Sequence, residues 1–174
     1  MKICFITPFF HPVKGGMEPH VFQIPKGLVS KGHDVHVFTS NSSRVGKILG
    51  SDEIYQGIKI KRFNTWFKLD TFSPVFPFVL YELIYSNFDI VHVHSYRHFH
   101  NLAVLFTKCK CFMTLHWPDY PKGLRSRFMD FIIPIFDKTI GKFLLHKYDK
   151  LIAVNGLEVS WIKNNFNIKE NKIK

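Results

Sequence analysis

Apolar residues along the chain fall into short, nearly continuous runs, separated by stretches in which apolar positions recur every three or four residues. Runs of about four to eight β-branched and aromatic residues are typical of strands that are buried on both faces of a sheet. The run at 58–63 instead alternates with polar residues, which predicts a strand near a sheet edge. Buried strands are predicted at 2–7, 34–39, 89–93, 111–115 and 151–154.

The intervening stretches have the spacing of helices. Helices are predicted at 18–31 and 157–166, and a longer amphipathic helix is predicted at 124–145, where Pro134 is expected to introduce a bend. The polar, glycine-punctuated segment 40–57 is typical of a mobile loop. Strands that alternate with helices predict an α/β fold, a Rossmann-like, doubly wound and mainly parallel sheet.

Length and charge narrow the class of protein. A chain of 174 residues predicts one domain. The formal net charge of +11 favours anionic partners such as nucleotides, acidic lipid head groups or nucleic acid. No apolar run reaches the roughly 20 residues that span a bilayer. Prolines and charges interrupt the first residues, so no signal peptide is predicted, and three cysteines without metal-site spacing favour a reducing cytoplasm.

The first predicted strand leads through a short loop to Gly15 and Gly16 at the start of a helix. Glycines let the backbone approach a ligand, and the N-terminus of a helix directs unpaired N–H groups at negative charge. The spacing fits neither the dinucleotide fingerprint nor the P-loop, but it predicts a phosphate or diphosphate site; the alternative is a merely flexible loop. Glu18 is expected to complement the helix dipole, or to bond the loop or a substrate.

Polar residues directly follow two other predicted strands: His94, Ser95 and Tyr96 after one, and His116 and Trp117 after another. In open α/β sheets, ligands bind beyond the carboxyl ends of the strands. A histidine there can donate a hydrogen bond to a sugar hydroxyl or to developing negative charge. Trp117 could offer an apolar face to a sugar ring, with structural packing as the alternative.

The histidine-rich stretch 92–100 raises the question of a metal site. His92 and His94 share a face of their strand, but no carboxylate or thiolate with suitable spacing completes a ligand set. We therefore expect no metal and no cofactor, with His92 as a hydrogen-bonded core residue and His94 facing a ligand.

Aromatic residues make up 16% of the chain and include 19 phenylalanines. The segments 66–88 and 124–145 combine them with Lys and Arg, a composition that suits contact with an anionic membrane surface. Packing against the sheet is the alternative. The charge also permits a module that binds nucleic acid, but the chain lacks the aromatic and basic strand motifs of such modules.

Five segments, in this order and spacing, resemble the amino-terminal domain of retaining family-4 glycosyltransferases with the GT-B fold: ITPFFHPVKGGMEPHVFQI, KGHDVHVFT, DIVHVHS, TLHW and LIAVN. The resemblance covers nearly the whole chain. It implies two Rossmann-like domains that face each other across a cleft, with the amino-terminal one shaping the acceptor site. It further implies sugar transfer from a nucleotide-diphosphate sugar with retention, usually without a metal.

The resemblance also assigns roles to the candidate residues. Gly15 and Gly16 would approach the donor diphosphate, and His116 would assist the reaction at the transferred sugar. The residues expected to line the acceptor side are His94, Ser95, Tyr96, Trp117 and Glu18.

The family's carboxyl-terminal domain, which holds most of the nucleotide site, is not among these 174 residues. We therefore expect 1–174 to be an isolated acceptor-side domain with little activity alone; the alternative is a split enzyme whose second domain is a separate partner chain. Pro19 and Pro25 depart from the family pattern, so the first helix is expected to sit differently.

The acceptor is expected to be a glycan or a lipid-linked molecule. The protein is expected to be cytoplasmic and to lie peripherally at the inner membrane face. Half of a nucleotide-sugar epimerase, or a non-catalytic basic module for nucleic acid or membrane, are the alternatives.

Overall fold

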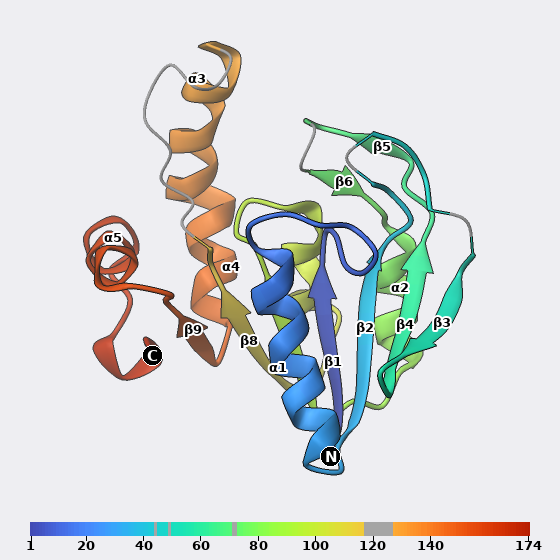
Figure 1. The fold of residues 1–174 in the computed structure, drawn as a ribbon. Coiled ribbons are helices and arrows are strands. Elements are labelled where there is room, and N and C mark those ends of the chain that lie inside the picture. Colours follow the sequence, from blue (N-terminus) through green and yellow to red (C-terminus); the bar gives the residue numbers. More distant parts are fainter. Residues whose placement is uncertain (44, 49, 71–72, 117–126) are drawn as a thin grey trace.

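A seven-stranded sheet forms the centre of the protein, with strand order β3-β4-β2-β1-β7-β8-β9 (Figure 1). The computed structural model describes residues 1–43, 45–48, 50–70, 73–116 and 127–174. Neighbouring strands are parallel except for the antiparallel pair β3–β4. The strands are β1 (Lys2–Thr7), β2 (Asp34–Ser40), β3 (Asp52–Tyr55), β4 (Ile58–Phe63), β7 (Ile90–His94), β8 (Lys110–Thr114) and β9 (Lys150–Ile152). The predicted doubly wound, mainly parallel α/β fold is confirmed.

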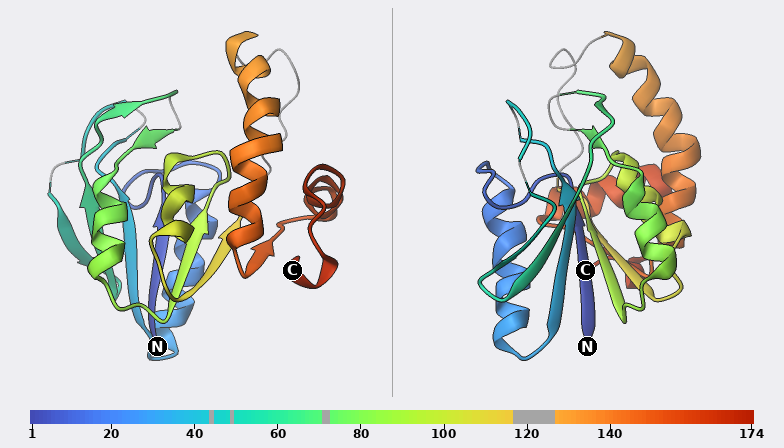
Figure 2. Two further views of the ribbon diagram at one scale, coloured as in Figure 1. Left: turned by 180° about the vertical axis from the view of Figure 1, so that it is seen from behind. Right: turned by 90° about the vertical axis from the view of Figure 1, so that its right-hand side faces the viewer.

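Helices cover both faces of this sheet: α1 lies on one face, and α2 and α4 lie on the other (Figure 2). The predicted helices at 18–31 and 157–166 are present as α1 and α5. The helical elements are α1 (Glu18–Ser30), α2 (Phe78–Tyr85), η1 (Phe99–Leu105), α3 (Arg127–Phe136), η2 (Asp137–Gly141), α4 (Lys142–Lys147), α5 (Gly156–Phe166) and η3 (Glu170–Lys172). A small hairpin pairs β5 (Phe67–Lys68) with β6 (Pro74–Val75).

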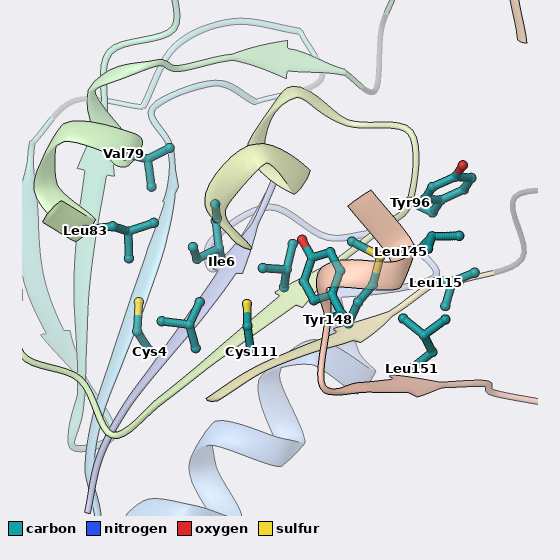
Figure 3. Packing of buried hydrophobic residues seen from close by; sticks show 14 of the residues in the cluster. Cys4, Ile6, Val79, Leu83, Tyr96, Cys111, Leu115, Leu145, Tyr148 and Leu151 are labelled. Atoms are coloured by element: carbon teal, nitrogen blue, oxygen red, sulfur yellow. The ribbon is translucent and has the colours of Figure 1, made fainter. Parts of the chain in front are cut away.

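The two faces of β1 belong to two different cores. Ile3 and Phe5 pack with Val21 of α1, whereas Cys4 and Ile6 pack in the larger cluster on the opposite face (Figure 3). Because alternate strand residues point to opposite faces, a strand that is covered on both sides must be apolar at nearly every position. This is why the strand-forming runs in the sequence do not alternate.

The order of the strands reverses beside β1. The chain leaves β1 through α1 on one face and leaves β7 through η1 on the other face, and these two strands are neighbours. In doubly wound sheets, the crevice that binds ligands lies at this switch point, beyond the carboxyl ends of the strands. The segments that follow β1 and β7 therefore lie where a ligand site is expected.

The segment 40–57, predicted to be a mobile loop, instead contains β3, and this part of the prediction is wrong. β3 pairs with β4 through a tight turn in which Gln56 and Gly57 both have positive φ angles, 50° and 80°. Two such residues give the turn that best matches the twist of a hairpin. The prediction failed because Asp52 and Glu53 are poor strand formers and the turn lacks the usual Asn-Gly pair. β4 accordingly lies next to the edge, as predicted.

The predicted amphipathic helix at 124–145 is helical from Arg127, where the described part begins, to Lys147. Its middle, η2, is a π-helical turn, and α3 has no buried residue. The helix projects beyond the carboxyl edge of the sheet (Figure 1). Within the described residues, none of the helices combines the length and apolar character that crossing a membrane requires.

Candidate functional site

The loop after β1 is anchored to the neighbouring strands. The Ser40 hydroxyl donates a hydrogen bond to the Pro8 carbonyl oxygen at 2.6 Å, and the Arg62 guanidinium donates to the His11 carbonyl oxygen at 2.6 Å. Phe9 within the loop is buried. These contacts hold the approach to the glycine pair in place rather than leaving it free.

The glycine pair leads directly into α1. Gly15 is half-buried and Gly16 is exposed, and a Cβ atom built on Gly16 would meet nothing within 4 Å. Met17, the N-cap residue, makes no side-chain cap hydrogen bond to the first turn of the helix. Free space around Gly16, next to a helix N-terminus without a side-chain cap, suits an anion. The predicted diphosphate site is compatible with this arrangement and stays a prediction.

Two histidines meet at the carboxyl edge of β7 and β8. His94 pairs with Thr114 in the sheet register, and His116 lies two residues further along, on the same face. Nδ1 of His94 lies 2.9 Å from Nε2 of His116, within hydrogen-bonding distance. The His94 ring is also stacked on Phe5, with ring centroids 5.8 Å apart. The pairing was not predicted, although both residues were.

Both histidines are uncharged at neutral pH. Burial lowers the pKa of His116 to about 4, with a smaller contribution from nearby His20. Burial also lowers the pKa of the completely enclosed His94 well below its usual value. A neutral imidazole has one donor and one acceptor nitrogen, so His116 can bond His94 and still offer its second nitrogen.

Backbone strain is concentrated at the same edge. Ser95, Arg97 and His116 have φ angles of 71°, 66° and 59°. Residues other than glycine adopt this left-handed backbone conformation only at a cost in free energy, and such residues cluster at functional sites. These φ angles turn the chain sharply after β7 and after β8, so that polar side chains lie together at the edge of the sheet.

Two residues that the sequence did not single out connect this edge to α1. The Ser95 hydroxyl lies 3.0 Å from the sulfur of Met17, directly after the glycine pair. The ring of His20, in the first turn of α1, meets His116 edge-on with centroids 5.8 Å apart. Sequence reasoning could have found His20 from its place in the first helical turn, two residues after Glu18. The residues directly after the glycine pair, Ser95 and the His94–His116 pair therefore lie together at the carboxyl edge of the sheet.

Of the other predicted site residues, the structure describes Tyr96 and Glu18. Tyr96 is buried in the core, and its hydroxyl donates to the Asp137 carboxylate at 3.1 Å, so it contacts the helix 127–147 rather than the histidine pair. Glu18 is buried at the start of α1. Trp117 lies outside the described residues.

The remaining histidines of β7 and η1 are bonded in the core. His92 shares a hydrogen bond with the Thr114 hydroxyl at 2.8 Å, as expected of a satisfied core residue. His100 donates to the His94 carbonyl oxygen at 2.7 Å. Across the described ranges, no cluster of three or more His, Cys, Asp or Glu side chains could hold a metal ion.

Comparison with known proteins gives one family. The model of the family described as Glycosyltransferase Family 4 matches residues 14–174. An uncharacterized glycosyltransferase of Methanocaldococcus jannaschii is 26% identical over 95% of this chain and 45% of its own length. In Homo sapiens, a phosphatidylinositol N-acetylglucosaminyltransferase subunit is 28% identical over 54% of this chain and 20% of its own length. In Saccharomyces cerevisiae, the phosphatidylinositol N-acetylglucosaminyltransferase GPI3 subunit is 31% identical over 54% of this chain and 21% of its own length. The chain therefore spans less than half the length of these relatives.

Proposed function

Because the chain belongs to Glycosyltransferase Family 4, we propose that it forms the acceptor-side part of an enzyme that transfers a sugar, with retention, from a nucleotide-diphosphate sugar. The observation that carries this proposal is the meeting of the His94–His116 pair with the uncapped start of α1 at the switch point of the sheet. Family membership favours glycosyl transfer over the epimerase and nucleic-acid alternatives.

In this proposal, the glycine loop and the start of α1 receive the diphosphate. Negative charge on the diphosphate increases while its bond to the sugar breaks, and positioned N–H donors stabilise that charge. The acceptor hydroxyl forms the new bond to the sugar, and its proton passes to the departing diphosphate. We propose that His116 hydrogen-bonds the sugar during this step. The nucleoside is held by a second domain, so nucleotide binding by these 174 residues alone is weak.

A titration with nucleoside diphosphates tests the anion site. We expect UDP or GDP to shift the backbone amide resonances of Gly15, Gly16 and His20, and Gly16→Val to abolish those shifts because its side chain fills the approach to the helix. Gly27→Ala, a substitution within α1 where a Cβ meets nothing within 4 Å, serves as the control. Amide shifts confined to other parts of the chain would contradict the proposed site.

We also propose that the acceptor is lipid-linked and that the protein works at an anionic membrane surface, on the cytoplasmic side. The name of the human relative specifies transfer of N-acetylglucosamine to phosphatidylinositol, a lipid. On α3, four apolar side chains spaced by threes and fours are exposed: Phe128, Phe131, Ile132 and Ile135. This stripe faces away from Asp137, which bonds the body of the protein.

Basic residues lie next to this apolar stripe. Arg127, Lys138 and Lys142 are all exposed on the same continuous helix. Helices that lie in a membrane interface place their phenylalanines below the lipid head groups and their cations at the level of the head groups. Each cation near an anionic surface contributes about 1 kcal/mol of attraction.

Cosedimentation with vesicles tests this surface. We expect binding to vesicles that contain phosphatidylglycerol, weaker binding to pure phosphatidylcholine, and a loss of at least about tenfold in Phe128→Ser/Phe131→Ser, because buried aromatic side chains contribute about 1.5–3 kcal/mol each. Lys138→Gln/Lys142→Gln should remove only the preference for anionic lipid. The control is Ile54→Ser, which alters a residue that is 74% exposed on β3. Equal binding by the control and the phenylalanine variant would refute the proposal.

A further inference from the structure

One hydrogen bond joins His94 and His116. Because both rings are neutral at pH 7, each carries one N–H group, and only one of the two rings donates in this bond. Nδ1 of His94 faces Nε2 of His116 at 2.9 Å. Two neutral imidazoles can make this bond in two ways: His94 donates from Nδ1, or His116 donates from Nε2. The choice decides which nitrogen of His116 carries a proton, and therefore what His116 offers to a ligand.

The surroundings of His94 distinguish the two arrangements. Its other nitrogen, Nε2, is buried and has no hydrogen-bond partner among the described residues. If His116 donated, this nitrogen would be an N–H group buried without an acceptor. If His94 donates, the same nitrogen is only an unpaired acceptor, which proteins leave buried more often than an unpaired donor. The second arrangement is the less costly one.

The position of the His94 ring is set by its neighbours. It is stacked on His92, with ring centroids 4.4 Å apart, and on Phe5. His100 bonds its backbone carbonyl from the opposite side of the chain. The ring is therefore enclosed, and its Nδ1 is directed at His116.

We propose that His94 is a positioning residue that holds the proton of His116 on Nδ1, so that His116 presents an N–H donor to the ligand. Nδ1 of His116 makes no hydrogen bond with the part of the chain that the structure describes. Within the proposed glycosyltransferase, on which this consequence rests, His116 donates to a sugar hydroxyl or to the departing diphosphate oxygen. In this state it does not accept a proton at Nδ1, so it acts as a hydrogen-bond donor and not as a general base.

Imidazole ¹⁵N resonances test the assignment directly. In long-range ¹H–¹⁵N spectra at pH 7, we expect His116 to show a protonated Nδ1 and an unprotonated Nε2. His94→Asn should preserve this pattern, because the amide N–H of asparagine occupies nearly the position of Nδ1. His94→Leu removes the donor, and we expect the Nε2-protonated form of His116 to appear, seen as an exchange of the two nitrogen shifts.

A wild-type His116 protonated on Nε2 would overturn the proposal, and so would a His94→Leu spectrum that leaves the tautomer unchanged. If His94→Leu does not fold, the spectra of the wild type and of His94→Asn decide. The measurement needs no turnover. A failure to transfer sugar would therefore refute the proposed function without affecting this assignment, and a wrong tautomer would leave glycosyl transfer standing.

Discussion

At the scale of single residues, Gly141 shows how closely the helix 127–147 approaches the end of β7. A Cβ atom at this position would overlap the Tyr96 hydroxyl and would lie 3.1 Å from both a ring carbon and the carbonyl oxygen of Phe136. Tyr96 is enclosed by the core and bonded to Asp137, so it cannot move aside freely. Glycine is needed here for space, not for an unusual φ angle.

We therefore expect Gly141→Ala to lower the free energy of unfolding by about 1–3 kcal/mol, the usual cost of overpacking. Gly27→Ala is the matched control, because it lies within helix α1 with nothing near its Cβ position, and it should raise stability by about 0.5–1 kcal/mol. Urea unfolding followed by circular dichroism measures both. Equal effects of the two substitutions would show that the close approach at Gly141 is not tight.

At the scale of elements, the helix 127–147 is attached to the sheet through its π-helical turn. The Arg97 guanidinium donates two hydrogen bonds to the Asp137 carboxylate, at 3.0 and 2.5 Å, and Tyr96 donates a third. Arg97 and Asp137 are both mostly buried. Two-point bonds between a guanidinium and a carboxylate are strong and directional, so this contact determines which face of the helix points outward.

Asp137→Leu should consequently loosen the helix, because it leaves a buried guanidinium without its carboxylate. We expect amide hydrogen exchange across 127–141 to accelerate by at least about tenfold, while exchange in α1 stays unchanged. Asp130→Asn, on α3 of the same helix, is the control and should have little effect. Slow exchange in Asp137→Leu would show that the apolar contacts of α4 are sufficient to hold the helix.

At the scale of the whole molecule, buried histidines make stability depend on pH. Burial lowers the pKa of His92 and His100 to about 3 and that of His98 and His116 to about 4. It also lowers the pKa of His94 well below its usual value. In the unfolded chain these groups titrate near 6.5, so the unfolded state binds more protons between about pH 6.5 and 4. Stability is therefore complete above pH 6.5 and decreases as the pH falls through this range.

We expect the free energy of unfolding to fall by more than about 1.4 kcal/mol per pH unit near pH 5, the limit for one histidine, because several act together. Urea unfolding at a series of pH values measures the slope. His100→Gln removes one titrating ring while keeping an N–H donor for the His94 carbonyl, and it should reduce the slope. A stability that stays constant from pH 7 to 5 would contradict the buried, neutral state of these rings.

The pattern of residues was sufficient to predict the strands that are buried on both faces, including β1 and β7, and the amphipathic helix α1, because burial leaves a continuous or helically spaced apolar signal. It was not sufficient for β3, which carries Asp52 and Glu53 and depends on pairing with β4. For the candidate site, the residues that end strands could be identified, since ligands of such sheets lie there. His20 and the role of Tyr96 could not, because both depend on contacts with distant parts of the chain.

The sequence by itself determined which segments form strands and helices, and which polar side chains stand at their ends. Only the tertiary structure decided which of those ends meet. The parallel register of β7 and β8 brings His94 against His116, and the packing of the helix 127–147 brings Asp137 to Tyr96. The physical reason is that local propensity depends on neighbours in the chain, whereas these hydrogen bonds join residues 22 and 41 positions apart.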